Sequence, residues 1–185
     1  MSSQAEIDLA YSGWGERLVA KGWRPYLLTF MFKPLPGSPT AVAHQMEREV
    51  ERVYATLLTR IVRKPARTPL DRLPVWFCCH DRPVYKHSKI SLRDAAVNDG
   101  AHTHATAFLP PWSRLREGLG KHFDEHARLY VRPRCPLLRI DCVPVVRRVG
   151  YVVGYTRKEV GRSAQGQDAS FVLPRAAREV WVRAA

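Results

Sequence analysis

The hydrophobic positions of the chain fall into short runs that are typical of strands. Residues 26–33, YLLTFMFK, are aromatic and β-prone and end at prolines and a glycine, which predicts a buried strand. Residues 73–81 (LPVWFCCHD), 101–109 (AHTHATAFL) and 137–146 (LLRIDCVPVV) are similar, although Pro144 disturbs the last of them. The pattern therefore predicts strands at four places along the chain.

A long amphipathic segment follows the first of these strands. Ser38 and Pro39 supply an N-cap and a first-turn proline, and apolar residues then recur at helical spacing as far as Ile61. Charged residues fill the other face, as expected of a helix that lies on a sheet. Weaker helical patterns cover residues 112–130, despite two internal glycines, and residues 150–160.

The two ends of the chain have less regular patterns. In residues 1–24, an N-terminal extension, three glycines interrupt a short helical pattern, and we expect Trp14 and Trp23 to pack this extension against the main body. Residues 161–185 form a C-terminal tail that begins polar and loop-like and ends with a pattern that favours a short helix. Residues 25–160 would then make up the main domain.

The predicted element order is β-α-β-β-α-β-α, with no internal repeat and no low-complexity linker. A chain of 185 residues is long enough for one domain with a substantial core. This order predicts an α+β fold in which a single antiparallel sheet carries helices against one face, in a ferredoxin-like arrangement.

The chain is strongly basic, which changes the expected partner. It contains 30 Lys and Arg against 17 Asp and Glu, and its formal net charge is +13. Such an excess favours a polyanionic partner, most often nucleic acid, over a basic surface without a specific partner. Cations in residues 60–69 (RIVRKPARTP) are suited to follow a phosphate backbone.

Cysteine usage and hydropathy indicate a reduced, cytoplasmic protein with no membrane partner. The cysteines Cys78, Cys79, Cys135 and Cys142 include no C-x-x-C pair, which disfavours a zinc ribbon. Cys78 and Cys79 lie in an apolar run and are expected in the core. Neither a signal peptide nor an apolar run of about 18 residues is evident.

The candidate chemistry centres on His102 and His104. Alternate side chains of a strand project to the same face, so both imidazoles would stand close enough to hold one metal ion. A hairpin-like pairing with the preceding strand would bring His80 near the pair, with Asp81 beside it, and we expect His80 to be the third ligand. The alternative is a set of ordinary surface histidines.

The ligand types narrow the choice of metal ion. Neutral imidazoles, with or without a carboxylate, suit Mn²⁺, Zn²⁺ or Ni²⁺, and Mg²⁺ less well. His87 is a reserve candidate, whereas His44, His122 and His126 are expected to be surface or packing residues.

A second group of reactive side chains lies in residues 150–159, GYVVGYTRKE. On a helix Tyr151 and Tyr155 share a face, and Lys158 lies three residues beyond Tyr155. A phenol is a poor nucleophile at neutral pH because its pKa is about 10, and a nearby ammonium group favours the phenolate. The alternative is an ordinary amphipathic helix whose tyrosines pack on a sheet.

Three of these segments, in this order, resemble the motifs of the HUH endonuclease superfamily: the strand YLLTF, the H-x-H strand HTHATAF and the Y-x-x-x-Y-x-x-K helix YVVGYTRK. The order resembles that of rolling-circle replication initiators (Rep proteins), and the paired tyrosines are similar to those of two-tyrosine phage and plasmid initiators. The family usually has a bulky apolar residue where Thr103 stands and often a lysine at Gly154. Its third ligand is commonly an acid or glutamine, where we expect His80.

This resemblance implies metal-dependent nicking and joining of single-stranded or hairpin DNA, in rolling-circle replication initiation or related mobile-element processing. In such enzymes the histidines hold a divalent ion, here expected to be Mn²⁺ or Mg²⁺, and a tyrosine forms a 5′-phosphotyrosine intermediate. Tyr155 would be the first nucleophile, Tyr151 the second and Lys158 their electrostatic support. A separate helicase and host replication proteins are expected partners, because the chain carries no helicase motif.

Two other functions fit the same residues. A non-catalytic DNA-binding protein on the same fold, such as a repressor or a structural binder, accounts for the charge without a metal ion. A metal-dependent hydrolase that uses activated water would need the histidines and not the tyrosines. The sequence makes no prediction of the oligomeric state.

Overall fold

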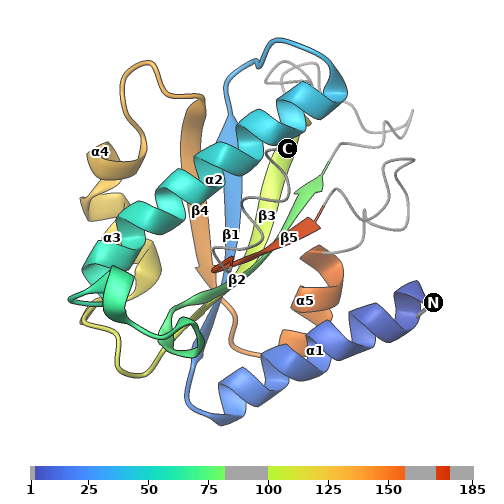
Figure 1. Cartoon of the computed structure of the whole chain (residues 1–185), viewed down its shortest axis with the longest axis vertical. Coiled ribbons are helices and arrows are strands. Elements are labelled where there is room, and N and C mark those ends of the chain that lie inside the picture. Colours follow the sequence, from blue (N-terminus) through green and yellow to red (C-terminus); the bar gives the residue numbers. More distant parts are fainter. Residues whose placement is uncertain (1–2, 82–99, 157–169, 176–185) are drawn as a thin grey trace.

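The computed structural model describes residues 3–81, 100–156 and 170–175 (Figure 1). In chain order the elements are α1 (Gln4–Ala20), β1 (Arg24–Phe32), α2 (Pro39–Ile61), the 3₁₀ turns η1 (Pro65–Arg67) and η2 (Leu70–Arg72), β2 (Val75–Asp81), β3 (His102–Leu109), α3 (Leu119–Glu125), α4 (Ala127–Tyr130), β4 (Leu137–Pro144), α5 (Val149–Thr156) and β5 (Ser170–Leu173). The strands form one sheet in the order β4-β1-β3-β2-β5, and every neighbouring pair is antiparallel. The predicted α+β fold with a single antiparallel sheet is confirmed.

Strand β3 lies at the centre of this sheet, between β1 and β2. Thr29 of β1 and Cys79 of β2 lie opposite His104, and Asp81 lies opposite His102. The hairpin-like pairing of the second and third predicted strands is thereby confirmed. Because residues opposite one another in a sheet project to the same face, these five side chains share one face.

Helix α2 covers the other face of the sheet (Figure 1). Ser38 caps its N-terminus by accepting a hydrogen bond from the Ala41 backbone at 3.3 Å, and Pro39 occupies its first turn, as predicted. Tyr54 donates its hydroxyl to the Pro74 carbonyl at 2.7 Å. The core on this face includes Leu28, Phe30, Phe32, Met46, Val50, Val53, Leu57, Ile61, Trp76 and Cys78.

Helices α1 and α5 pack together on the face opposite α2, so helices cover both faces of the sheet and not the single face predicted. Ser3 and Glu6 form a capping box that starts α1. Trp14 packs on Phe77 with ring centroids 4.9 Å apart, and Trp23 is buried, so both tryptophans attach this segment as expected. The core of this face contains Leu18, Trp23, Val75, Phe77, Phe108 and Val153.

The expected interruption of the N-terminal segment by glycines is wrong, because α1 runs through Gly13 and Gly15 as one helix of 17 residues. Gly15 lies where the helix approaches the sheet most closely. A Cβ atom at this position would lie 2.9 Å from Phe108 and 3.1 Å from Val153. Gly15 therefore allows α1 to pack closely on β3 and α5. The sequence pattern predicted a helix break at the same glycine.

Three shorter segments also differ from the prediction. The helix expected over residues 112–130 begins at Leu119, after a turn that follows β3, and is divided into α3 and α4. Strand β4 ends at Pro144, and β5 adds an edge strand within the segment expected to be a loop-like tail. The short helix expected at the end of the chain lies outside the described residues. In the described ranges, no helix has both the length and the apolar character to cross a membrane.

Replacing Gly15 by alanine is expected to destabilise the fold, because the added Cβ would collide with Phe108 and Val153. Gly13→Ala is the matched control, since its Cβ would meet the flexible end of Arg17 at 3.3 Å. Both variants gain the same helix propensity, so the unfolding free energy of Gly15→Ala should lie about 1–3 kcal/mol below that of Gly13→Ala. Urea unfolding followed by circular dichroism measures this difference, and equal stabilities would contradict the close packing of α1.

Candidate metal centre

Three side chains converge where β3 begins and β2 ends. The Nε2 atoms of His102 and His104 lie 3.0 Å apart, and Asp81 Oδ2 lies 3.6 Å from the first and 3.7 Å from the second. Neighbouring ligand atoms around an ion with bonds of about 2.1 Å are separated by roughly 3.0–3.4 Å. The three atoms therefore stand close to the spacing that a single shared ion requires.

Hydrogen bonds orient both imidazoles toward this point. His102 donates Nδ1–H to the Gly100 carbonyl at 2.8 Å, because a carbonyl can only accept, and this leaves the Nε2 lone pair facing His104. His104 Nδ1 lies 3.1 Å from the hydroxyl of Thr29 on β1. Partners on the second ring nitrogen are the usual support of metal-binding histidines. The threonine of the first sequence motif thus positions the second histidine.

Burial keeps His104 in the form that binds metal. Desolvation lowers the pKa of His104 to about 4, the neighbouring His102 acts in the same direction, and a hydrogen bond with the Leu28 backbone opposes both. At neutral pH the imidazole is therefore uncharged. The two Nε2 atoms lie at a hydrogen-bond distance of 3.0 Å, at which one ring can donate to the other, and a bound cation would take the place of the shared proton.

The donor set fits the divalent ion that the family resemblance implies. Two imidazole nitrogens and one carboxylate oxygen suit Mn²⁺, Zn²⁺ or Ni²⁺, and Mg²⁺ less well. All three residues are partly exposed, so solvent or a substrate can reach the point where they meet. Three protein ligands leave coordination positions open, as in catalytic sites.

His80, the residue expected as third ligand, does not join this group, and the structure places Asp81 beside the two histidines in its stead. In the register of β2 with β3, His80 lies opposite Thr103, on the face covered by α2. Its Nδ1 lies 2.8 Å from the Thr103 hydroxyl, and its buried ring contacts Phe171 with centroids 5.5 Å apart. The signal for Asp81 was present in the sequence, as an acidic residue next to His80.

Helix α5 brings the tyrosines to the face of the metal ligands. The hydroxyl of buried Thr156 lies 3.2 Å from that of Thr106, two residues beyond His104, and this contact attaches the end of α5 to β3. The Tyr155 ring lies 6.0 Å from the His104 ring, centroid to centroid. Tyr151, one helical turn earlier, stacks on Tyr155 with ring centroids 6.4 Å apart. Tyr151 is 68% exposed, whereas Tyr155 is 43% exposed. Tyr155 is thus adjacent to the candidate centre and Tyr151 is next to it on the solvent side.

A second group of metal-type ligands, Glu117, His122 and His126, is better explained as part of the packing. His122 Nδ1 lies 2.9 Å from the Glu117 carboxylate, and its Nε2 lies 2.8 Å from the hydroxyl of Tyr130. Both ring nitrogens of the buried His122 are therefore engaged, which agrees with the packing role expected from the sequence.

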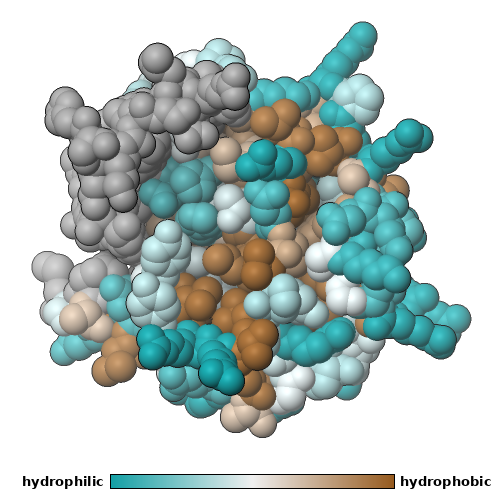
Figure 2. Space-filling model, turned by 180° about the vertical axis from the view of Figure 1, so that it is seen from behind, coloured by the Kyte–Doolittle hydropathy of each residue, from teal (hydrophilic) through white to brown (hydrophobic). Residues whose placement is uncertain are grey.

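The sheet beside the metal centre is open on the side of β1 and β4. On the face of His104, Leu27 lies opposite Val143 and Met31 lies opposite Arg139. Val143 is 58% exposed. Figure 2, which views the molecule from the side opposite α2, shows hydrophobic patches among polar residues on this side. Apolar surface with nearby cations is suited to single-stranded nucleic acid, whose bases pack while its phosphates pair.

No family model, curated protein or solved structure matched this chain. Two residues of the sequence hypothesis, Lys158 and the reserve ligand His87, lie outside the described residues. A proposal of function therefore rests on the convergence of Asp81, His102 and His104 and on Tyr155 beside them.

Two substitutions distinguish the alternative third ligands. Asp81→Asn should weaken Mn²⁺ binding at least about tenfold, because it removes the charged ligand oxygen. His80→Gln, which keeps a hydrogen-bonding side chain beside Thr103, should leave Mn²⁺ affinity unchanged. Titration calorimetry with MnCl₂, on variants whose folding is verified by circular dichroism, measures both affinities. If only His80→Gln lost Mn²⁺ affinity, His80 and not Asp81 would be the third ligand.

Proposed function

We propose that this chain is a metal-dependent enzyme that nicks and rejoins single-stranded DNA through a tyrosine, in rolling-circle replication initiation or related mobile-element processing. The observation that carries the proposal is the position of Tyr155, 6.0 Å from the His104 ring on the face of the ligand triad. The net charge of +13 supports a polyanionic substrate.

The side chains have complementary roles in this reaction. A divalent ion held by Asp81, His102 and His104 would supply Lewis-acid stabilisation of the scissile phosphate. The Tyr155 oxygen forms a bond to phosphorus and releases its proton to solvent, while the bond from phosphorus to the 3′ oxygen breaks and that oxygen takes up a proton. The products are a 5′-phosphotyrosine and a free 3′-hydroxyl, and the reverse attack of a 3′-hydroxyl rejoins the strand.

Tyr151 is suited to a second transfer. It stacks on Tyr155 and is the more exposed of the two, so it can accept or attack a second strand while the first remains attached. Basic charge alone would suit a non-catalytic DNA binder equally well. The nuclease is favoured because a binder needs neither converging metal ligands nor a tyrosine beside them.

The covalent intermediate provides the test of this function. With Mn²⁺ present, a mixed-sequence pool of single-stranded oligonucleotides labelled at the 3′ end should transfer its label to the protein in a band that survives SDS. A 5′ label should remain on the released fragment, because the tyrosine retains the 5′-phosphate. Tyr155→Phe should reduce the adduct at least about a hundredfold, as expected for loss of a nucleophile.

Several controls accompany the labelling experiment. His44→Ala, an exposed histidine on α2, should label as the wild type does, whereas His102→Ala and addition of EDTA should abolish the adduct. Tyr151→Phe should retain the first cleavage. An adduct that persists in the double variant Tyr151→Phe/Tyr155→Phe would refute the assignment of the nucleophile. Salt-sensitive DNA binding with no adduct from any oligonucleotide would favour the non-catalytic alternative.

A further inference from the structure

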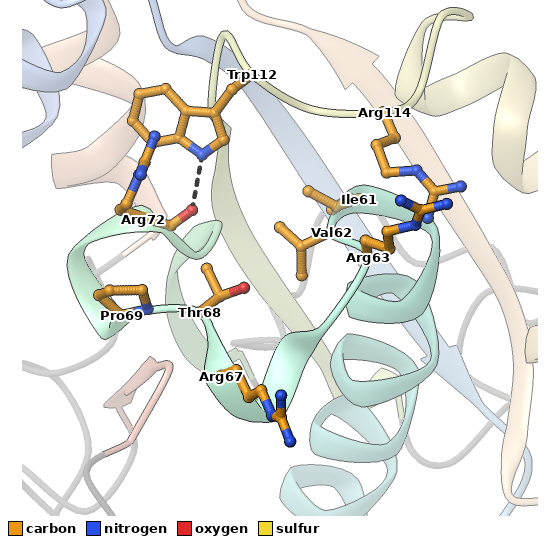
Figure 3. A pocket seen from close by; sticks show the side chains of 9 residues that line it. All are labelled: Ile61, Val62, Arg63, Arg67, Thr68, Pro69, Arg72, Trp112 and Arg114. Atoms are coloured by element: carbon orange, nitrogen blue, oxygen red, sulfur yellow. Dashed lines mark hydrogen bonds between the residues drawn. The ribbon is translucent and has the colours of Figure 1, made fainter.

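A pocket of about 340 Å³ lies beyond the end of β3 that is opposite the candidate metal centre. Figure 3 shows the residues that line it. From His102 to Leu109, β3 covers about 24 Å at roughly 3.4 Å per residue, and the pocket adjoins the turn that follows this strand. We call it the Arg–Trp pocket. Its walls come from the end of α2, the η1–η2 connection and the turn after β3, and its polar and aromatic lining residues are Arg63, Arg67, Thr68, Arg72, Trp112 and Arg114.

Backbone and side-chain hydrogen bonds hold these three segments together. The Arg114 backbone donates to the Ile61 carbonyl at 3.0 Å, which ties the turn to the last residue of α2. Trp112 Nε1 donates to the Arg72 carbonyl at 3.0 Å, which ties the same turn to η2 (Figure 3). These bonds hold the walls of the pocket in fixed positions relative to one another.

The pocket is cationic without compensating acids. Its four arginines are exposed, none of them forms an ion pair with any described residue, and no described carboxylate lines the pocket. Arg67 and Arg72 stand in the last turns of η1 and η2, and Arg63 follows the end of α2, so helix C-termini favour a cation at each of these positions. The dipoles do not explain why these three arginines and Arg114 gather around one pocket. Guanidinium groups bind phosphate by paired, charge-assisted hydrogen bonds.

Trp112 gives the pocket an aromatic surface beside these cations. Trp112 is 42% exposed, and the edge-to-face contact with Trp23, with centroids 5.4 Å apart, fixes its indole. The Arg72 guanidinium lies over one face of the indole, 5.1 Å from the ring centroid, so the other face is the one available to a base. Proteins that bind single-stranded nucleic acids combine an exposed aromatic ring, on which a base stacks, with nearby cations, which pair with a phosphate.

We propose that the Arg–Trp pocket binds one nucleotide unit of single-stranded DNA, with its phosphate on the arginines and its base on Trp112. The choice of ligand rests on the proposed function, whereas the pocket itself is remote from the cleavage chemistry. Strand β3, about 24 Å long, separates the pocket from the candidate metal centre, so the two sites would contact different parts of one bound strand. The pocket would hold a part of the substrate distant from the scissile phosphate, and so help to select where the strand is cut.

Binding without cleavage tests this proposal. A fluorescent, mixed-sequence single-stranded oligonucleotide of about 16 nucleotides, a length in the range of ssDNA-binding domains, is titrated with full-length protein in EDTA. Arg63→Ala/Arg114→Ala should weaken binding roughly tenfold or more. It should also reduce the slope of log K against log salt by about 1.4, the value for two lost single-strand phosphate contacts.

The matched control is Arg48→Ala/Arg128→Ala, which removes the same charge from exposed positions on α2 and α4. It should leave the salt slope unchanged. Equal losses in the two double variants would show that net charge alone sets the affinity, and would overturn the proposal. A mononucleotide that fully displaces the oligonucleotide at a similar concentration would overturn it as well, by reassigning the pocket to a free nucleotide.

Photocrosslinking tests the stacked base on the unaltered protein. An oligonucleotide that carries 5-iodouracil should crosslink to the peptide containing Trp112, and crosslinks found exclusively elsewhere would contradict the proposed base position. The two proposals fail separately. Pocket-dependent binding without any covalent adduct would leave the pocket and remove the nicking function. Normal adduct formation, with equal DNA binding by the two double arginine variants, would support the nicking function and refute the pocket proposal.

Discussion

The position of β3 between two strands is the constraint on which the rest of the site depends. Pairing on both sides fixes its register, so His102 and His104 project to one face while Thr103 and Ala105 project into the core under α2. A slip of one residue would exchange these faces and bury both imidazoles in an apolar core. The candidate metal centre therefore has the rigidity of the sheet centre, although its side chains lie at the ends of strands.

The same face of β3 also positions Tyr155, the proposed nucleophile. Phe108 fills the space under α1 and α5, and Gly15 lets α1 come close enough to enclose it. Two residues earlier, Thr106 contacts Thr156 beside Tyr155. One strand thus sets both the metal ligands and the helix that carries the tyrosine. Packing against a common strand therefore sets the position of Tyr155 relative to the candidate ligands.

Much of this arrangement follows from the sequence by strand alternation, and the parts that do not follow have definite physical causes. Period-two spacing is a local property, so the histidine pair and its shared face could be predicted from residues 101–109 alone. The third ligand depends on the register between two strands, and a difference of one residue separates His80 from Asp81. The glycines of α1 have a low helix propensity, and their role in close packing depends on partners far away in the chain. The fifth strand is too short for a clear pattern and follows a polar segment.

His80 and Thr103 are best understood as a single feature. Thr103 stands between the two metal-ligand positions, where the resembled family usually has a bulky apolar residue, and its hydroxyl bonds to the buried His80 ring at 2.8 Å. An apolar residue at position 103 would remove this hydrogen bond. The buried His80 nitrogen, which lost its hydration on folding, would then lack the bond that compensates for that loss. Conversely, an apolar residue at 80 would remove the partner of the threonine hydroxyl. The departure at Thr103 therefore compensates for a polar residue on the neighbouring strand. It lies on the side of the sheet away from the ligand triad, so it weakens neither the metal centre nor the position of Tyr155.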